Sequence, residues 1–315
     1  MIEVEKLEKN YGPARALKGI SFDVQRGDVL GFLGPNGAGK STTMKVLSGY
    51  LLPTGGRASI DNLDVVKDSL EVRRRIGYLP ESTPLYTEML VLDYLRFVGR
   101  IRGVTANRLK AAVDRVVDLC GLRAVTGKNI LELSKGYKQR VGLAQAMIHE
   151  PDVLILDEPT SGLDPNQIVE VRSLIMRLGE QHTVILSTHY LQEVEASCSR
   201  VIIVSQGEIV ADDTCANLVS DVSVGAVQAR ISGTGEQVSQ GITASVPGAT
   251  IEEIGRDGDY GCYRISGLDE SAQAGLAEVV VRNGWSLAEI KPERASLEDV
   301  FRKLTLEASR RAGDA

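Results

Sequence analysis

The sequence predicts an α/β fold, with a layered parallel-sheet core followed by a smaller second domain. A short apolar run, Val29–Leu33, leads into a glycine-rich loop at residues 34–42, which is the strand-loop-helix order of a phosphate-binding loop. Apolar runs at 153–156 and 184–187 alternate with segments of helical periodicity, as in a parallel sheet covered on both faces. Beyond about Ser220 the composition becomes small, polar and glycine-rich, which indicates a domain boundary.

Short strands are expected before the loop and a helix directly after it. The first ~25 residues alternate apolar and polar positions around a turn at Tyr11-Gly12-Pro13, which predicts a small antiparallel sheet. A helix is predicted from Lys40 to about Leu52. Two strands that pair with each other are then predicted at residues 58–60 and 76–79, after a Pro/Gly turn.

Helical periodicity and turn residues organise the middle of the chain. Apolar positions at spacings of three and four predict helices over residues 88–122. Ser134 is placed to cap a further helix over 134–148. Residues 201–210 have the pattern of a hairpin that turns at Gln206-Gly207.

The last third of the chain predicts a separate, ferredoxin-like α+β domain with the order βαββαβ. Its strands are expected near residues 224–231, 249–254, 260–265 and 286–290, and its helices near 235–242 and 270–283. Ser296 is expected to begin an amphipathic closing helix. The predicted domains are therefore a nucleotide-binding unit at residues 1–220 and an accessory domain at 221–315.

Composition disfavours several classes of function. The formal net charge is −6, so no nucleic-acid partner is expected, because such a surface needs a basic face. The four cysteines lack metal-ligand spacing, as in a reduced cytosolic protein. The first residues are charged, unlike a signal peptide, and the apolar runs fall far short of the roughly 20 residues of a membrane span. A cytosolic protein without a membrane segment of its own is expected.

The glycine-rich loop carries the groups that hold a nucleoside triphosphate. Its glycines allow a tight turn whose N–H groups face the phosphates. Lys40 adds a positive charge for the β- and γ-phosphates, and Ser41 adds a hydroxyl ligand for Mg²⁺. The helix that begins there directs its positive dipole end to the same phosphates. The expected phosphate-binding residues are Gly34, Pro35, Asn36, Gly37, Ala38, Gly39, Lys40, Ser41 and Thr42.

GTPases, kinases, helicases and transport ATPases all use a phosphate-binding loop, so a second motif is needed to tell these classes apart. The apolar strand at 153–156 ends in two carboxylates, Asp157 and Glu158. Asp157 is expected to hold the metal shell, and Glu158 is expected to polarise the attacking water.

Five motifs in this order make the chain resemble the ATPase subunit of an ATP-binding cassette (ABC) transporter over residues 1 to about 215. They are the loop at Gly34–Ser41, the signature stretch Leu133-Ser134-Lys135-Gly136-Tyr137, the strand ending in Asp157-Glu158, the D-loop stretch Ser161-Gly162-Leu163-Asp164 and the switch histidine His189. The long interval between the loop and the Asp157-Glu158 strand fits the inserted helical subdomain of this family.

The resemblance implies that two cassettes face each other head to tail, so that each ATP also meets the signature helix of the partner. A serine at a helix N-terminus can donate its hydroxyl there, and a following glycine lets the backbone approach. The implied catalytic residues are Lys40, Glu158 and His189, and those implied to contact the nucleotide outside the loop are Tyr11, Ser134, Gly136 and Asp164. Tyr11 stands where the family stacks an aromatic ring on adenine.

The chain departs from the family pattern at two places. Lys135 and Tyr137 replace the usual glycine and glutamine of the signature, whereas the phosphate-facing Ser134 and Gly136 are kept. Glu81 stands where the Q-loop glutamine is usual. A carboxylate still reaches a metal or the attacking water, but it adds negative charge, so altered metal dependence is expected. The expected metal contacts are Ser41, Asp157 and Glu81.

The implied function is ATP hydrolysis, with ATP and Mg²⁺, that drives a separate integral-membrane permease. The stretches 77–81, 133–137 and 296–301 resemble those of ATPases paired with ABC-2-type permeases, which favours export. The implied assembly is a homodimer or a paired cassette held at the cytoplasmic face of the membrane by the permease. One alternative is a soluble ABC ATPase acting on ribosomes or DNA, disfavoured by the single cassette and its short insertion. Another is a regulatory module that does not hydrolyse, disfavoured by Glu158 and His189 together.

Overall fold

The computed structural model describes residues 1–222, 226–268, 270–292 and 296–313. The chain separates into two compact units. The first comprises Met1–Cys215 together with the last residues from Lys303, and the second comprises Ala216–Arg302. The predicted domain at 221–315 therefore differs from the observed units, because the end of the closing helix groups with the first unit.

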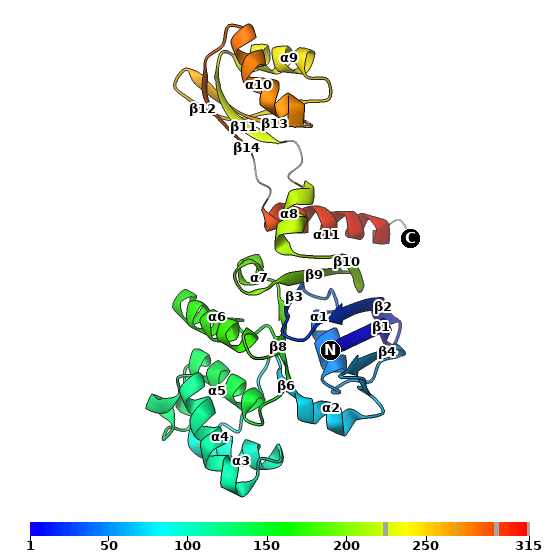
Figure 1. Cartoon of the computed structure of the whole chain (residues 1–315), viewed down its shortest axis with the longest axis vertical. Coiled ribbons are helices and arrows are strands. Elements are labelled where there is room, and N and C mark those ends of the chain that lie inside the picture. Colours follow the sequence, from blue (N-terminus) through cyan, green and yellow to red (C-terminus); the bar gives the residue numbers. More distant parts are fainter. Residues whose placement is uncertain (223–225, 269, 293–295, 314–315) are drawn as a thin grey trace. The chain divides into compact units, whose positions relative to one another are not determined.

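A mixed six-stranded sheet in the order β10-β9-β3-β8-β7-β6 forms the centre of the first unit (Figure 1). Its strands are β3 (Val29–Leu33), β6 (Ile76–Leu79), β7 (Val153–Asp157), β8 (Thr183–Thr188), β9 (Arg200–Ser205) and β10 (Glu208–Asp213). Neighbouring strands are parallel except β10, which pairs antiparallel with β9. This confirms the parallel core, and the hairpin turns at Gln206 and Gly207 as predicted.

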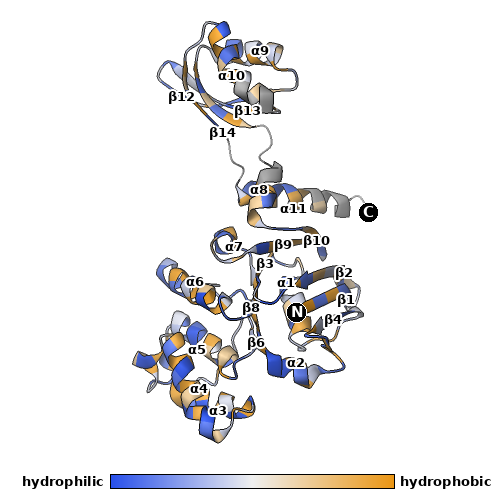
Figure 2. Cartoon of the chain, in the orientation of Figure 1, coloured by the Kyte–Doolittle hydropathy of each residue, from blue (hydrophilic) through white to orange (hydrophobic). Residues whose placement is uncertain are grey.

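A second sheet, in the order β2-β1-β4-β5, contains the N-terminal strands. They are β1 (Ile2–Tyr11), β2 (Ala14–Val24), β4 (Gly55–Ile60) and β5 (Leu63–Asp64). The predicted pairing of 58–60 with 76–79 is wrong: β4 pairs with β1, whereas Ile76 of β6 lies parallel to Val153. The helix α2 (Ser69–Arg75), which is mostly hydrophilic in Figure 2, intervenes and carries the chain from one sheet to the other.

The first unit contains the predicted helices, one of which ends early, and also α2 and α7, which were not predicted. Besides α2, its helices are α1 (Lys40–Leu47), α3 (Val91–Ile101), α4 (Ala106–Leu119), α5 (Lys135–Met147), α6 (Pro165–Gly179) and α7 (Leu191–Ser197), with short 3₁₀ turns at Arg123–Val125 and Ile130–Glu132. α1 ends at Leu47 rather than near Leu52, because Gly49 adopts φ +68°. The N–H of Tyr50 then bonds the carbonyl of Lys45, which is the hydrogen bond of a Schellman helix end.

The central sheet divides two apolar cores, and β7 contributes to both. Val153 and Ile155 pack in the core that holds β1, β2 and α1. Leu154 and Leu156 point to the opposite face, in the core formed with α3 to α6. Because alternate side chains of a strand face opposite ways, this double burial fixes the register of β7. It also places the next two residues, Asp157 and Glu158, at the carboxyl edge of the sheet.

The second unit contains the predicted βαββαβ order. Its elements are β11 (Val227–Ser232), α9 (Gly235–Ser245), β12 (Thr250–Asp257), β13 (Tyr260–Ser266), α10 (Glu270–Arg282) and β14 (Leu287–Pro292). The sheet order β12-β13-β11-β14, with antiparallel neighbours, is the ferredoxin-like arrangement. The start of the first predicted strand lies outside the described residues. The unit encloses its own apolar core, which includes Ile231 and Tyr263.

Two further helices precede and follow the βαββαβ elements in the sequence. α8 (Cys215–Val222) is not among the predicted elements, whereas α11 (Leu297–Gly313) begins as predicted after Ser296. The Asp299 N–H donates to Ser296 Oγ at 3.2 Å, and the Ser296 N–H donates to Asp299 Oδ2 at 3.0 Å, which is a reciprocal capping box. Within the described ranges, no helix combines the length and apolar character needed to cross a bilayer.

Candidate functional site

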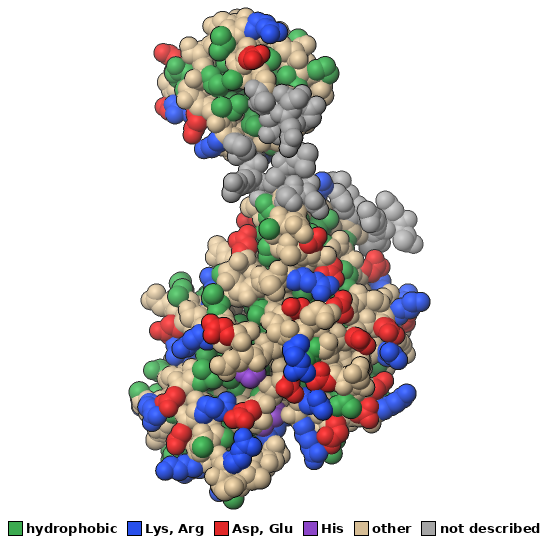
Figure 3. Space-filling model, viewed as in Figure 1, with side chains coloured by type: hydrophobic (Ala, Val, Ile, Leu, Met, Phe, Trp, Pro, Cys, Tyr) green, Lys and Arg blue, Asp and Glu red, His purple; other side chains and the backbone are tan. Residues whose placement is uncertain are grey.

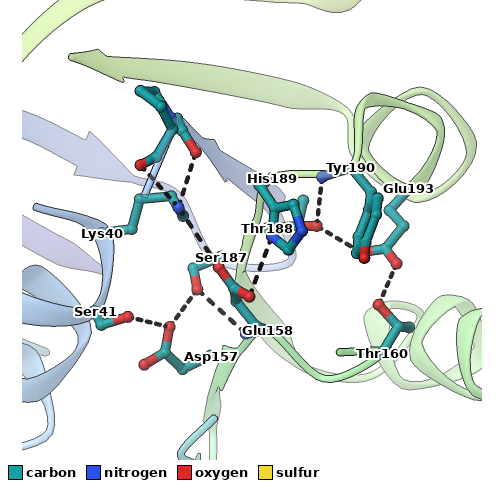
Figure 4. A network of polar contacts seen from close by, with 12 residues as sticks. Lys40, Ser41, Asp157, Glu158, Thr160, Ser187, Thr188, His189, Tyr190 and Glu193 are labelled. Atoms are coloured by element: carbon teal, nitrogen blue, oxygen red, sulfur yellow. Dashed lines mark hydrogen bonds and ion pairs between the residues drawn. The ribbon is translucent and has the colours of Figure 1, made fainter. Parts of the chain in front are cut away.

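Lys40 lies at the centre of the site, almost completely buried. Its side chain is 4% exposed, and Nζ donates to the carbonyls of Gly34 at 2.8 Å and Pro35 at 3.2 Å. Nζ also lies 3.5 Å from Glu158 Oε1 (Figure 4). The phosphate loop thus holds its one side-chain cation directly against the carboxylate at the end of β7.

Two glycines of the loop are required by its geometry. A Cβ on Gly34 would lie 2.4 Å from the Val204 carbonyl oxygen, so only glycine fits between the loop and β9. Gly39 has φ +110° at the start of α1, a conformation that side chains rarely adopt. The hairpin turn adds support that the sequence did not reveal, because the N–H of Gly207 donates to the Ala38 carbonyl at 3.0 Å.

Asp157 is held beside the loop by two hydroxyl groups. Ser41 Oγ donates to Asp157 Oδ1 at 3.0 Å, and Ser187 Oγ, from the neighbouring strand β8, donates to the same oxygen. Burial raises the pKa of Asp157 and the charge of Glu158 adds to this, while the two hydroxyl hydrogen bonds oppose it. Because a nearby cation favours the charged carboxylate, this arrangement is suited to hold a metal ion.

Glu158 and His189 face each other across the ends of β7 and β8. His189 Nδ1 lies 3.1 Å from Glu158 Oε2, a contact that becomes an ion pair when the ring is protonated (Figure 4). The Glu158 backbone has φ +48°, which is uncommon for a residue with a side chain. Its N–H donates to the Ser187 carbonyl at 3.0 Å. Tertiary contacts therefore hold Glu158 in a backbone conformation that turns its carboxylate toward Lys40 and His189.

A cavity of about 490 Å³ brings the phosphate loop together with Glu158 and His189, whereas Asp157 is not among its lining residues. The predicted residues that line it are Asn36, Gly37, Gly39, Lys40, Ser41, Thr42, Glu81, Glu158 and His189. Glu81, in the segment after β6, therefore lines the same cavity as the phosphate loop. Ala16 and Ser161 also line the cavity but were not predicted to bind. No sequence signal marks Ala16, whereas Ser161 belongs to the D-loop stretch.

The signature and D-loop residues lie at helix starts. Ser134 caps α5, as predicted, by accepting the Tyr137 N–H at 3.4 Å. Asp164 caps α6 by accepting the Gln167 N–H at 3.0 Å. A Cβ on Gly136 would lie 2.6 Å from the Gln167 side chain, so the starts of α5 and α6 are in contact. Among the described residues that line the cavity, none belongs to the signature stretch, so its role in nucleotide binding stays a prediction.

Tyr11 lies at the end of β1, and its side chain is 47% exposed. The Lys9 ammonium group lies 5.5 Å from its ring centroid. Tyr11 is not among the described residues that line the cavity, and adenine stacking by Tyr11 stays a prediction. Ala16, on the adjacent strand β2, lines the cavity instead.

The donor set fits Mg²⁺. Hydroxyl and carboxylate oxygens come from Ser41 and Asp157, 3.0 Å apart, and Mg²⁺ sites in nucleotide-binding proteins use one or two such groups together with phosphate oxygens and water. Within the described ranges, no group of three or more His, Cys, Asp or Glu side chains forms a protein-only metal cage. A Mg²⁺ ion held by Ser41 and Asp157 would take its remaining ligands from phosphate oxygens and water.

Replacing Glu81 by Gln is expected to raise the Mg²⁺ concentration that gives half-maximal ATPase rate, by roughly tenfold or less, because one negative charge leaves the cavity. A Mg²⁺ titration of the ATPase rate, compared with that of the exposed control Glu88→Gln, measures the shift. Superimposable curves for Glu81→Gln and the unaltered protein would place Glu81 outside the metal environment.

Comparisons with known proteins agree with this geometry. Residues 17–161 match the family model of the ABC transporter domain. The linearmycin resistance ATP-binding protein LnrL of Bacillus subtilis (strain 168) is 31% identical over 97% of this chain and 98% of its own length. The daunorubicin resistance ATP-binding protein DrrA3 of Streptomyces coeruleorubidus is 33% identical over 96% of this chain and 95% of its own.

A solved structure extends the likeness to the fold. The dimeric structure of MJ0796, a bacterial ABC transporter cassette, matches with a TM-score of 0.63 and 24% identity, over 68% of this chain and 98% of that one. The loop, the paired carboxylates and the switch histidine thus meet in a fold shared with a known cassette. Together with relatives that align over nearly the whole chain, they show that the protein belongs to the ABC transporter ATP-binding family, as an ATPase subunit.

Proposed function

We propose that this ATPase subunit cleaves ATP in the cavity between Lys40 and Glu158 and thereby drives an export permease of the ABC-2 type. The observation that carries the proposal is the Glu158 carboxylate, held 3.5 Å from the Lys40 ammonium and 3.1 Å from the His189 ring. That arrangement provides a base, a phosphate-binding cation and a second polar group around one point at the carboxyl edge of the sheet.

Each group has a distinct part in the reaction. Glu158 accepts a proton from water as the water oxygen attacks the γ-phosphorus, and the bond from that phosphorus to the bridging oxygen breaks to give ADP and phosphate. Lys40 binds the β- and γ-phosphate oxygens, and His189 orients Glu158 and the γ-phosphate. Ser41 and Asp157 would hold Mg²⁺, which supplies positive charge to the triphosphate.

Two copies of the chain, or this chain and a paired cassette, would complete the site. ABC ATP-binding subunits generally dimerise, and the solved cassette described above is a dimer. Ser134 is exposed at the start of the 13-residue helix α5, and an exposed helix start of this kind can bind an anion from another molecule. The proposed role of Ser134 and Gly136 is to close on the γ-phosphate bound by the partner.

The names of the relatives support transport over the alternatives. LnrL and DrrA3 are named for resistance to linearmycin and daunorubicin, which is consistent with export, whereas neither name points to ribosomes or DNA. Figure 3 shows Lys and Arg side chains interspersed with Asp and Glu on the visible face of the first unit. That face does not offer the continuous basic surface that nucleic acid requires. We place the subunit at the cytoplasmic face of the membrane, held by its permease.

Copurification from native membranes tests the pairing with a permease. The Glu158→Gln chain, tagged and expressed in its own host, is extracted in detergent with ATP and Mg²⁺, and its partners are identified by mass spectrometry. A multi-span membrane protein that also raises the ATPase rate of the unaltered chain after reconstitution supports the proposal. Recovery with ribosomal proteins, and no membrane partner, would favour the alternative function.

We also propose that the second unit is an accessory domain that folds by itself, since it encloses a core of its own. Residues 216–302, expressed alone, are expected to show a cooperative thermal transition by circular dichroism. The control is the Ile231→Asp variant, which places a charge at a fully buried core position and should abolish the transition. A non-cooperative melt of the unaltered fragment would show that this segment needs the rest of the chain.

A further inference from the structure

Glu193 is a buried carboxylate with no predicted role in the site. It lies in α7, is 3% exposed, and its two oxygens accept hydrogen bonds from two threonines. Thr188 Oγ1 donates to Oε2 at 2.7 Å, and Thr160 Oγ1 donates to Oε1 (Figure 4). Both of these hydrogen-bond partners of the Glu193 carboxylate are uncharged hydroxyl groups. A buried carboxylate held by hydroxyl groups alone is costly to keep.

The two threonines lie on the segments that carry the catalytic groups. Thr188 directly precedes His189 at the end of β8, and its hydroxyl also accepts the Tyr190 N–H at 3.0 Å. Thr160 follows Glu158 by two residues and directly precedes the D-loop stretch that begins at Ser161. The Ser161 N–H in turn donates to the Glu158 carbonyl at 3.1 Å. One carboxylate therefore ties the Glu158 turn to the His189 turn.

Stability alone does not account for a glutamate at this position. An apolar side chain of similar size would avoid the cost of burying a charge, and such replacements of buried ionic groups are often neutral or stabilising. The middle of α7 already has apolar support, because Val194 next to Glu193 is fully buried against Gly31 of β3. The bridge therefore contributes something that packing does not supply, which is a fixed spacing between two loops.

We propose that Glu193 is a positioning residue that sets the Glu158–His189 spacing and links it to the D-loop. The inference rests on the proposed function of that site. Because Thr160 borders the D-loop stretch that begins at Ser161, a displacement of that stretch would reach Glu158 and His189 through Glu193. Neither Glu193 nor the two threonines line the nucleotide cavity, so the bridge acts on turnover rather than on nucleotide binding.

The test compares Glu193→Ala with Val194→Ala in the full-length chain. Both remove a buried side chain of α7, but only the first removes the bridge. Glu193→Ala is expected to lower kcat by about 10²-fold, since small displacements of catalytic groups cost that much, with KM for ATP unchanged. Val194→Ala is expected to lower the melting temperature with kcat nearly retained. Equal loss of kcat in the two variants would overturn the proposal.

Four further variants probe the bridge with little change in side-chain volume. Thr160→Val and Thr188→Val each delete one hydroxyl and are expected to lower kcat, and Thr160→Ser is expected to restore it. Glu193→Gln keeps one acceptor and one donor for the two hydroxyls, so it is expected to retain most of the turnover. Valine variants with unaltered kcat would contradict the bridge even if Glu193→Ala did not fold.

A second readout separates this inference from the proposed function. The chain has three histidines, so the ring Cε1–H resonance of His189 can be assigned by substitution and followed without nucleotide. Glu193→Ala is expected to shift that resonance, and Val194→Ala is expected to leave it unchanged. If Glu193→Ala shifts the His189 resonance but the unaltered protein does not hydrolyse ATP, the bridge is supported and the proposed function is refuted. An unshifted resonance together with normal ATP turnover would refute the bridge alone.

Discussion

Replacing Glu158 by Gln is expected to stop ATP turnover while ATP binding is retained. The amide has the same shape but cannot accept the proton of the attacking water, whereas the contacts of Lys40 and Ser41 with phosphate and metal remain. General-base catalysis is worth on the order of 10²- to 10⁴-fold in rate, so the loss in kcat should fall in that range. Phosphate release and ATP affinity, measured on the same preparation, check both parts.

The same Glu158→Gln variant should accumulate ATP-bound dimers, because the event that opens the dimer no longer occurs. Size-exclusion chromatography with light scattering, in ATP and Mg²⁺, measures the mass. The control is Glu180→Gln, at an exposed position at the end of α6, which should turn over ATP like the unaltered chain. Turnover by Glu158→Gln at the unaltered rate would remove this residue from the catalytic role.

Replacing Lys40 by Ala is expected to abolish productive ATP binding. The substitution deletes a 4% exposed ammonium group and leaves the Glu158 carboxylate without its neighbouring cation. A charge-assisted hydrogen bond is worth about 1.5–3 kcal/mol, so two lost phosphate contacts should weaken affinity by about 10²-fold or more. Titration calorimetry measures the affinity, with the exposed Lys67→Ala as control. Equal affinities for the two variants would contradict the site.

Local signals in the sequence predicted most of the site. Ser134 caps the next few residues, and Gly39 acts through its own backbone conformation, so a motif is sufficient to place them. The strand before Asp157 is apolar at every position, and its burial on both faces follows from that pattern. Long-range strand pairing could not be predicted in this way. Residues 58–60 and 76–79 both have the pattern of a short strand, and no local sequence signal indicates that they belong to different sheets on either side of α2.

Residues that act through a distant partner were missed for the same reason. Glu193 is a single acidic residue in a short helix, and only the fold brings Thr160 and Thr188 to its two oxygens. Ala16 lines the cavity because β2 passes beside the phosphate loop. The grouping of the end of α11 with the first unit also depends on tertiary contacts, since its capping box specifies where the helix begins and not what it packs against.

The central claim is that two copies of the chain together form each site at which ATP is cleaved. The most direct test measures phosphate release per chain over a wide range of protein concentration. Because Ser134 of one copy is proposed to complete the site that contains Lys40 and Glu158 of the other, the rate per chain should rise with concentration and reach a plateau when the dimer is saturated. A rate per chain that stays constant down to concentrations at which light scattering shows only monomer would contradict a site completed by a second copy.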